Sequence, residues 1–278
     1  MSLPEASRLE AAFAAVREPW GVRHGATDAA GLFALLLLRW VGIVLLCPFF
    51  GGRLVPGPVK IGLAAVMAWF SAPWLSAQLS VPLALSPLGW WLSALHELAI
   101  GLLIGLGSSL VFFAATMAGD LVDSARGALT ASLLVPQLAT QASPLGDLYF
   151  QLFVVLYLLA GGHIFFLSAV LDSYRVFPPT GTMPGAALVN ESFLAMTVTC
   201  FGVMLKVAAP AVVVLLFADV VLGLANRVAP QMEVFFLGLG LKPAVGVLVV
   251  AISLYALPGP TREAFAGFHA WLLSWLHG

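Results

Sequence analysis

The chain has 278 residues, of which 61% are hydrophobic and only 9% are charged, and its formal net charge is −1. Soluble domains are about 45–50% apolar and about 25% charged, so this composition excludes a soluble globular protein and predicts an integral membrane protein. The near-neutral charge gives no reason to expect a nucleic acid as a partner.

The first 28 residues carry charges of both signs and lack the early apolar core of a cleavable signal peptide. Ser2 and Glu5 have the spacing of a helix capping box, and apolar residues follow at helical intervals. These residues are Leu9, Phe13, Val16 and Trp20. We therefore expect an amphipathic helix that lies at the membrane interface or docks on a partner protein.

Six long apolar segments follow and predict an all-α membrane protein. They cover residues 29–50, 61–79, 88–118, 148–171, 193–224 and 234–257. The turn at Pro56-Gly57-Pro58 predicts that the first two segments form a hairpin. The third and fifth segments exceed the roughly 20 residues that a bilayer core needs, so we expect them to tilt, kink or extend beyond the lipid.

Four charged residues lie well inside these apolar segments, namely Arg39, Glu97, Lys206 and Asp219. On insertion scales each would cost roughly 2.5–3.5 kcal/mol at the centre of a lipid-facing helix. We therefore expect their side chains to face other helices, partner subunits or water. Buried structural ion pairs and the lining of a polar conduit are both compatible with this pattern.

The centre of the chain has the most informative pattern. Asp120, Asp123 and Arg126 form a polar cluster, and an apolar loop broken by Gly, Ser and Pro comes next. After the loop, the segment 148–171 is expected to be one charge-free helix that crosses the bilayer. Non-helical backbone at membrane depth is tolerated only where protein or a water-filled cavity surrounds it. The loop therefore indicates a path through the protein with something in that path.

Motifs for bond chemistry are incomplete in this sequence. His96-Glu97 would need a second His four positions after His96 for a zinc-protease site, and that position is Ile100. His163 has no Cys or carboxylate nearby in sequence, so packing is favoured over metal binding. Neither a phosphate-binding loop nor a nucleophile elbow occurs. We predict no enzymatic activity, no cofactor and no metal site.

Four blocks, in order, resemble the FliR/SpaR/SctT family, the inner-membrane export-gate proteins of flagella and type III secretion injectisomes. The first block, 37–60, has an Arg inside an apolar helix, then a P-x-x-G turn and a proline. The second block, 96–127, is a Glu- and Gly-bearing helix that ends in an A-G-x-x-V-D element.

The third and fourth blocks extend the resemblance to about residues 29–257, nearly the whole chain apart from its ends. The third matches through His163, Ser173, Tyr174 and Pro178. The fourth matches through Pro210, Gly223, Asn226, Arg227, Pro230 and Gln231. Within the family, the D-x-x-R-G motif at 123–127 and the D-S-Y motif at 172–174 favour the injectisome branch over the flagellar branch.

The resemblance implies an export-gate fold of long kinked helical hairpins, similar to a fusion of two smaller partner subunits. Its helical core would cover residues 29–257, between amphipathic ends at 1–28 and 258–278. The implied function is that of a structural pore-forming subunit that conducts unfolded secreted polypeptides across the bacterial inner membrane. The implied partners are several copies each of two smaller hydrophobic subunits around one copy of this chain, and the export switch protein. The assembled core would be raised toward the periplasmic side.

The resemblance also maps a plug loop onto residues 127–143. An apolar constriction can gate a pore by excluding water, and the loop could alternatively be buried between helices. The predicted plug residues are Leu129, Leu133, Leu134, Val135, Pro136 and Leu138. The predicted assembly or conduit residues are Arg39, Glu97, Asp123, Arg126, His163, Lys206, Asp219, Asn226, Arg227 and Gln231.

Two other functions are compatible with a polytopic membrane protein. A small-molecule secondary transporter predicts inverted repeats and charged residues that converge on a midplane site, and no convincing repeat is visible. An intramembrane hydrolase needs a catalytic dyad, and the sequence offers no clear candidate pair.

Overall fold

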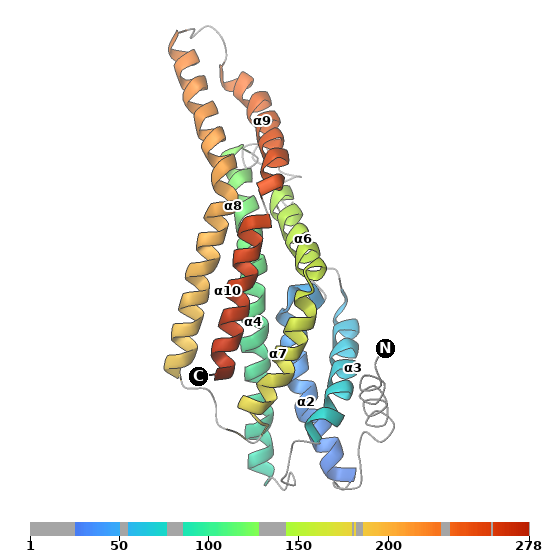
Figure 1. Cartoon of the computed structure of the whole chain (residues 1–278). Coiled ribbons are helices and arrows are strands. Elements are labelled where there is room, and N and C mark those ends of the chain that lie inside the picture. The colour runs from blue at the N-terminus through green and yellow to red at the C-terminus, as the bar shows by residue number, and fades with distance from the viewer. Residues whose placement is uncertain are drawn as a thin grey trace, which may run out of the picture. The chain divides into compact units, whose positions relative to one another are not determined.

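The computed structural model describes residues 26–50, 55–76, 86–127, 143–179, 181, 186–228, 234–256 and 258–277. All regular elements within these ranges are helices (Figure 1). The prediction of an all-α membrane protein is therefore confirmed. The N-terminal segment 1–25, the plug residues between 128 and 142, and Gln231 lie outside the described residues, so the predictions for them stay predictions.

The helices are α2 (Ala26–Leu46), α3 (Gly57–Ser76), α4 (Pro87–Ala125), α6 (Pro144–Leu159), α7 (Gly162–Val176), α8 (Ala186–Val228), α9 (Val234–Ala256) and α10 (Pro258–His277), and a 3-10 turn, η1 (Pro48–Phe50), follows α2. The chain divides into two compact units. Unit 1 contains α2, α3, α4 up to Ser109, and α7 from Phe165. Unit 2 contains α4 from Leu110, α6, α8 from Asn190, α9, and α10 up to Trp271.

Two helices in the described part of the chain, α4 and α8, are long and apolar enough to cross a membrane. They have 39 and 43 residues, which correspond to about 58 and 65 Å of helix. A bilayer core is about 30 Å thick, so the prediction of overlong helices is confirmed. The broken pair of α6 and α7 adds a third crossing if it forms one bent span.

The prediction of one continuous helix over 148–171 is wrong, because the chain breaks between α6 and α7. Gly161 has a φ of +74°, a left-handed conformation that glycine adopts without steric cost and that commonly ends a helix. A Cβ atom on the next residue, Gly162, would collide with the ring of Tyr157. The two glycines therefore permit a tight break that hydropathy alone does not reveal.

Unit 1 is built on the packing of α2 against α3 and α4. The Trp40 indole donates a hydrogen bond to the Ser71 hydroxyl at 3.0 Å, and Phe33 meets Trp69 edge to face. The first two apolar segments therefore pair, as predicted. Large side chains of α2, Leu35 among them, are fully buried in this unit.

Unit 2 has an aromatic core. The ring of Tyr157 on α6 lies 5.5 Å from that of Phe112 on α4 and 5.0 Å from that of Phe265 on α10, centroid to centroid. Phe265 and Phe268 on α10 are both buried in this core. Aromatic edge-to-face pairs add about 0.5–1.5 kcal/mol beyond their buried area, so this cluster ties three helices together.

Candidate functional site

Among the described residues, the most enclosed charged side chains are those of Arg39 on α2 and Glu97 on α4, both in unit 1. The Arg39 guanidinium donates through Nη2 to Glu97 Oε1 at 2.6 Å and through Nε to Oε2 at 2.8 Å. Both side chains are 0% exposed. A buried ion pair is tolerated only when its geometry is good and its remaining donors are satisfied, and this bidentate pair meets the first condition.

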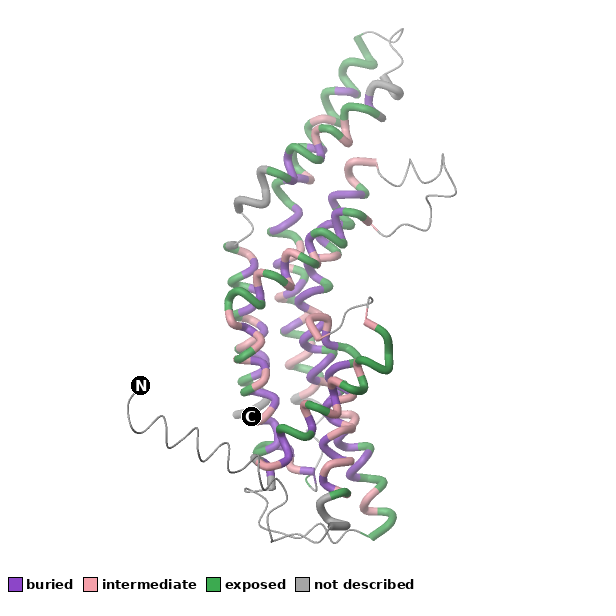
Figure 2. The backbone as a smooth tube through the Cα atoms, turned by 90° about the vertical axis from the view of Figure 1, so that its right-hand side faces the viewer, coloured by how far each residue is buried: buried purple, intermediate pink, exposed green. Residues whose placement is uncertain are grey.

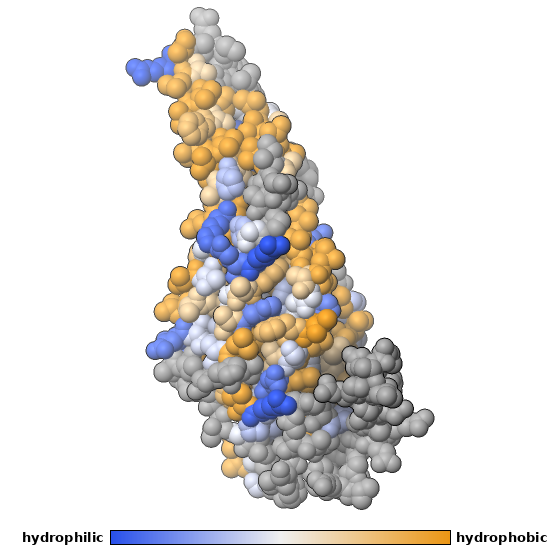
Figure 3. All heavy atoms as spheres, in the orientation of Figure 1, coloured by the Kyte–Doolittle hydropathy of each residue, from blue (hydrophilic) through white to orange (hydrophobic). Residues whose placement is uncertain are grey.

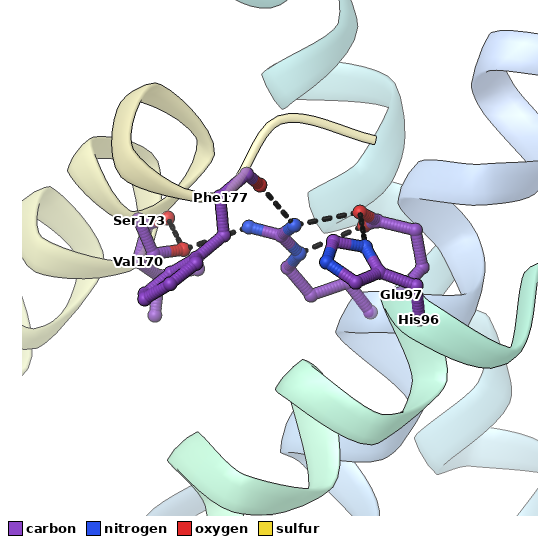
Figure 4. Close-up of polar contacts among 6 residues, drawn as sticks. His96, Glu97, Val170, Ser173 and Phe177 are labelled. Carbon is purple, nitrogen blue, oxygen red and sulfur yellow. Dashed lines mark hydrogen bonds and ion pairs between the residues drawn. The ribbon is translucent and has the colours of Figure 1, made fainter. Parts of the chain in front are cut away.

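The second condition is met by α7, as Figure 4 shows. Arg39 Nη1 donates to the Ser173 hydroxyl at 3.0 Å, and Nη2 also donates to the carbonyl of Phe177 at 2.6 Å. The ring of Tyr174 lies 3.9 Å from the guanidinium carbon, in cation–π contact. Arg39 therefore joins three helices of unit 1 at one point, and its fully enclosed side chain faces no solvent.

Close contact between the α2 and α4 backbones places the two charges opposite each other. A Cβ atom on Gly101 would collide with the carbonyl oxygen of Arg39, and one on Gly42 would lie 2.8 Å from the backbone nitrogen of Leu102. Glycines at such positions let two helices approach backbone to backbone. The glycines that the sequence shows inside the segment 88–118 thus have a local packing reason.

A second cluster, which we call the clasp, joins the end of α4 to the start of α6 in unit 2. The clasp consists of Asp123, Arg126, Ser143 and Leu145. The buried Asp123 carboxylate accepts hydrogen bonds from the Ser143 hydroxyl and from the backbone N–H of Leu145 at 3.0 Å. Arg126 pairs with the same carboxylate at 2.6 Å. The clasp therefore fixes the two positions from which the segment 128–142 departs and to which it returns.

Two glycines, Gly119 and Gly146, permit the close approach of α4 and α6 at the clasp. A Cβ atom on Gly119 would collide with the backbone of Leu145 and Gly146, and one on Gly146 would collide with Asp120 Oδ1. The predicted polar cluster of Asp120, Asp123 and Arg126 is thus brought together with the far end of the loop. Sequence reasoning missed this, although a Ser followed by Pro is a readable start of a helix, and Ser143 caps α6 by accepting from the Gly146 N–H.

The two charged residues predicted inside α8, Lys206 and Asp219, differ from Arg39 and Glu97. Each pairs with a residue on another helix of unit 2, and each side chain stays partly exposed. Lys206 pairs with Glu263 on α10, and their side chains are 56% and 59% exposed. Asp219 pairs with Lys242 on α9, and their side chains are 45% and 27% exposed. Glu263 and Lys242 escaped sequence reasoning because both lie far along the chain from their partners.

Three further predicted site residues in the described part of the chain do not join either cluster. Asn226 and Arg227 are exposed in the last turn of α8, and His163 is half-buried at the start of α7. Among the described residues, no group of three or more His, Cys, Asp or Glu side chains could hold a metal ion. The roles assigned to these residues in assembly or in a conduit stay predictions.

Residues 30–268 match the family model described as "Bacterial export proteins, family 1". The chain belongs to this family. The match spans residues of both compact units, including the Arg39–Glu97 pair and the clasp. The resemblance to the FliR/SpaR/SctT family of export-apparatus proteins is thereby confirmed.

Among relatives of this export protein is the flagellar biosynthetic protein FliR of Escherichia coli K12, which is 31% identical over 82% of this chain and 85% of FliR. The secretion system apparatus protein SsaT of Salmonella typhimurium is 33% identical over 64% of this chain and 69% of SsaT. The Yop proteins translocation protein T of Yersinia pestis is 30% identical over 79% of this chain and 84% of its own length. Flagellar and secretion-system relatives match at similar identity, so the injectisome branch stays a prediction.

Proposed function

We propose that this chain is a structural pore-forming subunit of a type III secretion export gate in the bacterial inner membrane. The observation that carries the proposal is the family match over residues 30–268. The gate would conduct unfolded secreted polypeptides and perform no bond chemistry. The absence of a phosphate-binding loop from the sequence fits a passive conduit that is driven by another component.

The low burial of α8 within the chain supports assembly with other subunits. Only 28% of the most apolar stretch of α8 is buried within the chain, although the helix is about twice as long as a bilayer core is thick. We propose that one copy of this chain assembles with several copies each of two smaller hydrophobic subunits, and with the export switch protein. The overlong helices also fit a core raised toward the periplasm.

The clasp supports the predicted plug loop at residues 127–143. Asp123 and the Gly119–Gly146 contact hold the two ends of this segment together, so its apolar residues start from a fixed base. We propose that Leu133, Leu134 and Val135 help to seal the closed gate by excluding water. Removal of Leu133–Leu138 should then leave assembly intact and raise the ion conductance of the membrane.

Native mass spectrometry of the chain purified in mild detergent, with its native apparatus expressed, tests the proposed function. We expect one copy of this chain with several copies of each of two small hydrophobic partners. A stable monomer that co-purifies with no export protein would contradict the proposal. Saturable uptake of a small molecule by that monomer in vesicles would instead favour the alternative, a secondary transporter.

A further inference from the structure

The Asp123–Arg126 pair of the clasp differs from a second pair with the same spacing. Asp172 and Arg175 on α7 also lie three residues apart, but their paired atoms are 3.2 Å apart and their side chains are 47% and 57% exposed. In the clasp the corresponding distance is 2.6 Å, and the side chains are 5% and 14% exposed. The spacing on one helix therefore does not by itself account for the enclosed pair of the clasp.

The additional cover on Arg126 comes from α9. A Cβ atom on Gly246 of α9 would lie 3.2 Å from both Cβ and Cδ of Arg126 and 3.8 Å from its Cγ. The aliphatic stem of Arg126 therefore packs against α9 at a point where that helix has no side chain. Burial of the stem restricts the rotamers of a long side chain and keeps water from the ion pair, which strengthens an otherwise weak interaction.

Gly246 belongs to the inner side of α9, which also contacts α8. One turn before Gly246, Lys242 pairs with Asp219 of α8. One turn earlier again, a Cβ atom on Gly238 would lie 3.4 Å from Leu222 of α8. Residues 238, 242 and 246 follow at intervals of four, so they share one side of the helix. The same side of α9 therefore contacts both α8 and the end of α4.

The outer side of the hairpin formed by α8 and α9 is open in the chain alone. Phe217 of α8 is 68% exposed, and Val247 and Leu248 of α9 are 57% and 62% exposed. Figure 2 shows buried and exposed residues alternating along these upper helices, and Figure 3 shows a mostly apolar surface over them. Within the described chain, the contacts that position α9 therefore lie on its inner side.

The Asp123 carboxylate connects this packing to the start of α6. Its Oδ1 pairs with Nε of Arg126, and its Oδ2 accepts a hydrogen bond from the Leu145 N–H at 3.0 Å. Leu145 lies in the first turn of α6, where backbone N–H groups have no partner within the helix. A rotation of the carboxylate that breaks one contact would break the other, so Arg126 helps to hold the start of α6 in place.

We propose that α9 is a brace for the clasp and that Gly246 is the positioning residue of this brace. Gly246 admits the Arg126 stem, and Arg126 in turn orients the Asp123 carboxylate. A shift of α9 away from α4 would release Arg126 and loosen the base of the loop. The position of α9 would then control the seal of the closed gate, a consequence that rests on the proposed function.

Hydrogen exchange at the Leu145 N–H, resolved to single residues by mass spectrometry of the assembled apparatus, tests the brace. Gly246→Leu places a branched side chain where the Arg126 stem lies, so we expect several-fold faster exchange at Leu145. Exchange in the interior of α6 should stay unchanged, because those N–H groups bond within the helix. Unchanged exchange at Leu145, or equal acceleration throughout α6, would overturn the brace.

Two comparisons separate positioning from a general loss of packing. Gly240→Leu is the matched control on α9, because among the described residues no atom outside its chain neighbours and its own helix lies within 4 Å of a Cβ position there. It should leave exchange at Leu145 unchanged. In an Arg126→Ala background, Gly246→Leu should add no further acceleration, since it acts through Arg126. Acceleration by Gly240→Leu, or additive acceleration in the double variant, would refute the inference.

A smaller substitution covers the case in which the leucine variant is not recovered from the membrane. Gly246→Ala adds only a methyl group 3.2 Å from the Arg126 stem, so exchange at Leu145 should accelerate less but in the same direction. Wild-type exchange at Leu145 in this variant would then overturn the brace.

Ion conductance of the assembled apparatus in planar bilayers distinguishes failure of this inference from failure of the proposed function. Gly246→Leu should raise the conductance, and removal of Leu133–Leu138 should raise it further. An increase with the deletion and none with Gly246→Leu would refute control of the seal by α9 and leave the proposed function intact. No increase with the deletion would refute the proposed plug, and exchange at Leu145 would still decide whether α9 braces the clasp.

Discussion

The helices α4 and α8 are nearly equal in length and both are strongly apolar, yet the chain covers them very differently. It buries 61% of the most apolar stretch of α4 and only 28% of that of α8. The charges follow the same division, since Glu97 on α4 is fully enclosed whereas Lys206 and Asp219 on α8 stay partly exposed. Hydropathy identifies both helices, but only the buried fraction shows that the chain's own helices bury most of the apolar stretch of α4 and leave most of that of α8 exposed.

The largest expected effect comes from breaking the enclosed charge pair. Glu97→Gln leaves the Arg39 guanidinium buried without its carboxylate, which typically costs about 3–5 kcal/mol. We expect most of the protein to be lost from the membrane, or a large fall in the thermal midpoint of the purified complex. The matched control, Glu263→Gln, removes one member of a half-exposed pair and should cost less than about 1 kcal/mol. Similar losses of stability with both variants would contradict the distinction between the enclosed charge pair of α4 and the half-exposed pair of α8.

One glycine in each helix tests how closely other parts of the chain pack against the helix backbone. Gly101→Ala on α4 places a methyl group against the Arg39 carbonyl and should cost about 1–3 kcal/mol in thermal stability. Apart from its chain neighbours and the backbone of its own helix, no atom lies within 4 Å of a Cβ position on Gly223 of α8, so Gly223→Ala should gain up to about 1 kcal/mol from helix propensity. Destabilisation of the isolated chain by Gly223→Ala would show that this part of α8 is covered from within.

The clasp offers a test of the loop that follows α4. Asp123→Ala removes the acceptor of the Ser143 hydroxyl and the Leu145 N–H, at a cost of about 1–3 kcal/mol. We expect assembly to persist and ion conductance through the assembled gate to rise, as measured in planar bilayers. Ser124→Ala, at an exposed neighbour whose hydroxyl donates only to the backbone carbonyl of Asp120, is the control and should leave conductance unchanged. Unchanged conductance with Asp123→Ala in an assembled complex would show that the clasp does not help to seal the closed gate.

The smallest effect on stability is expected at the end of α8. Arg227 is exposed, so Arg227→Ala should change the thermal stability of the isolated chain by less than about 0.5 kcal/mol. If this half of α8 is completed by partners, the same variant should still lower secretion of a reporter protein. Full secretion with normal assembly would show that the Arg227 side chain is needed for neither assembly nor secretion.

The sequence predicted the membrane class, the overlong helices and the family, because these depend on composition, segment length and ordered motifs. It could not predict that Arg39 pairs with Glu97 while Lys206 pairs with Glu263, since each choice depends on which helices are neighbours in space. The break at Gly161 was missed because a helix interrupted by two glycines has the same hydropathy as a continuous one. The clasp was predicted in part: the sequence analysis singled out Asp123 and Arg126, but it did not predict that Ser143 caps α6.

Cysteine protection tests most directly the claim that α8 is completed by other subunits. The native Cys47 and Cys200 are buried, and replacing both with Ala leaves a background for single cysteines. With Phe217→Cys in that background, we predict fast labelling by a small maleimide when the chain is expressed alone and strong protection in the assembled apparatus. Equal labelling rates in the two preparations, with partners shown to be present in one of them, would contradict the account.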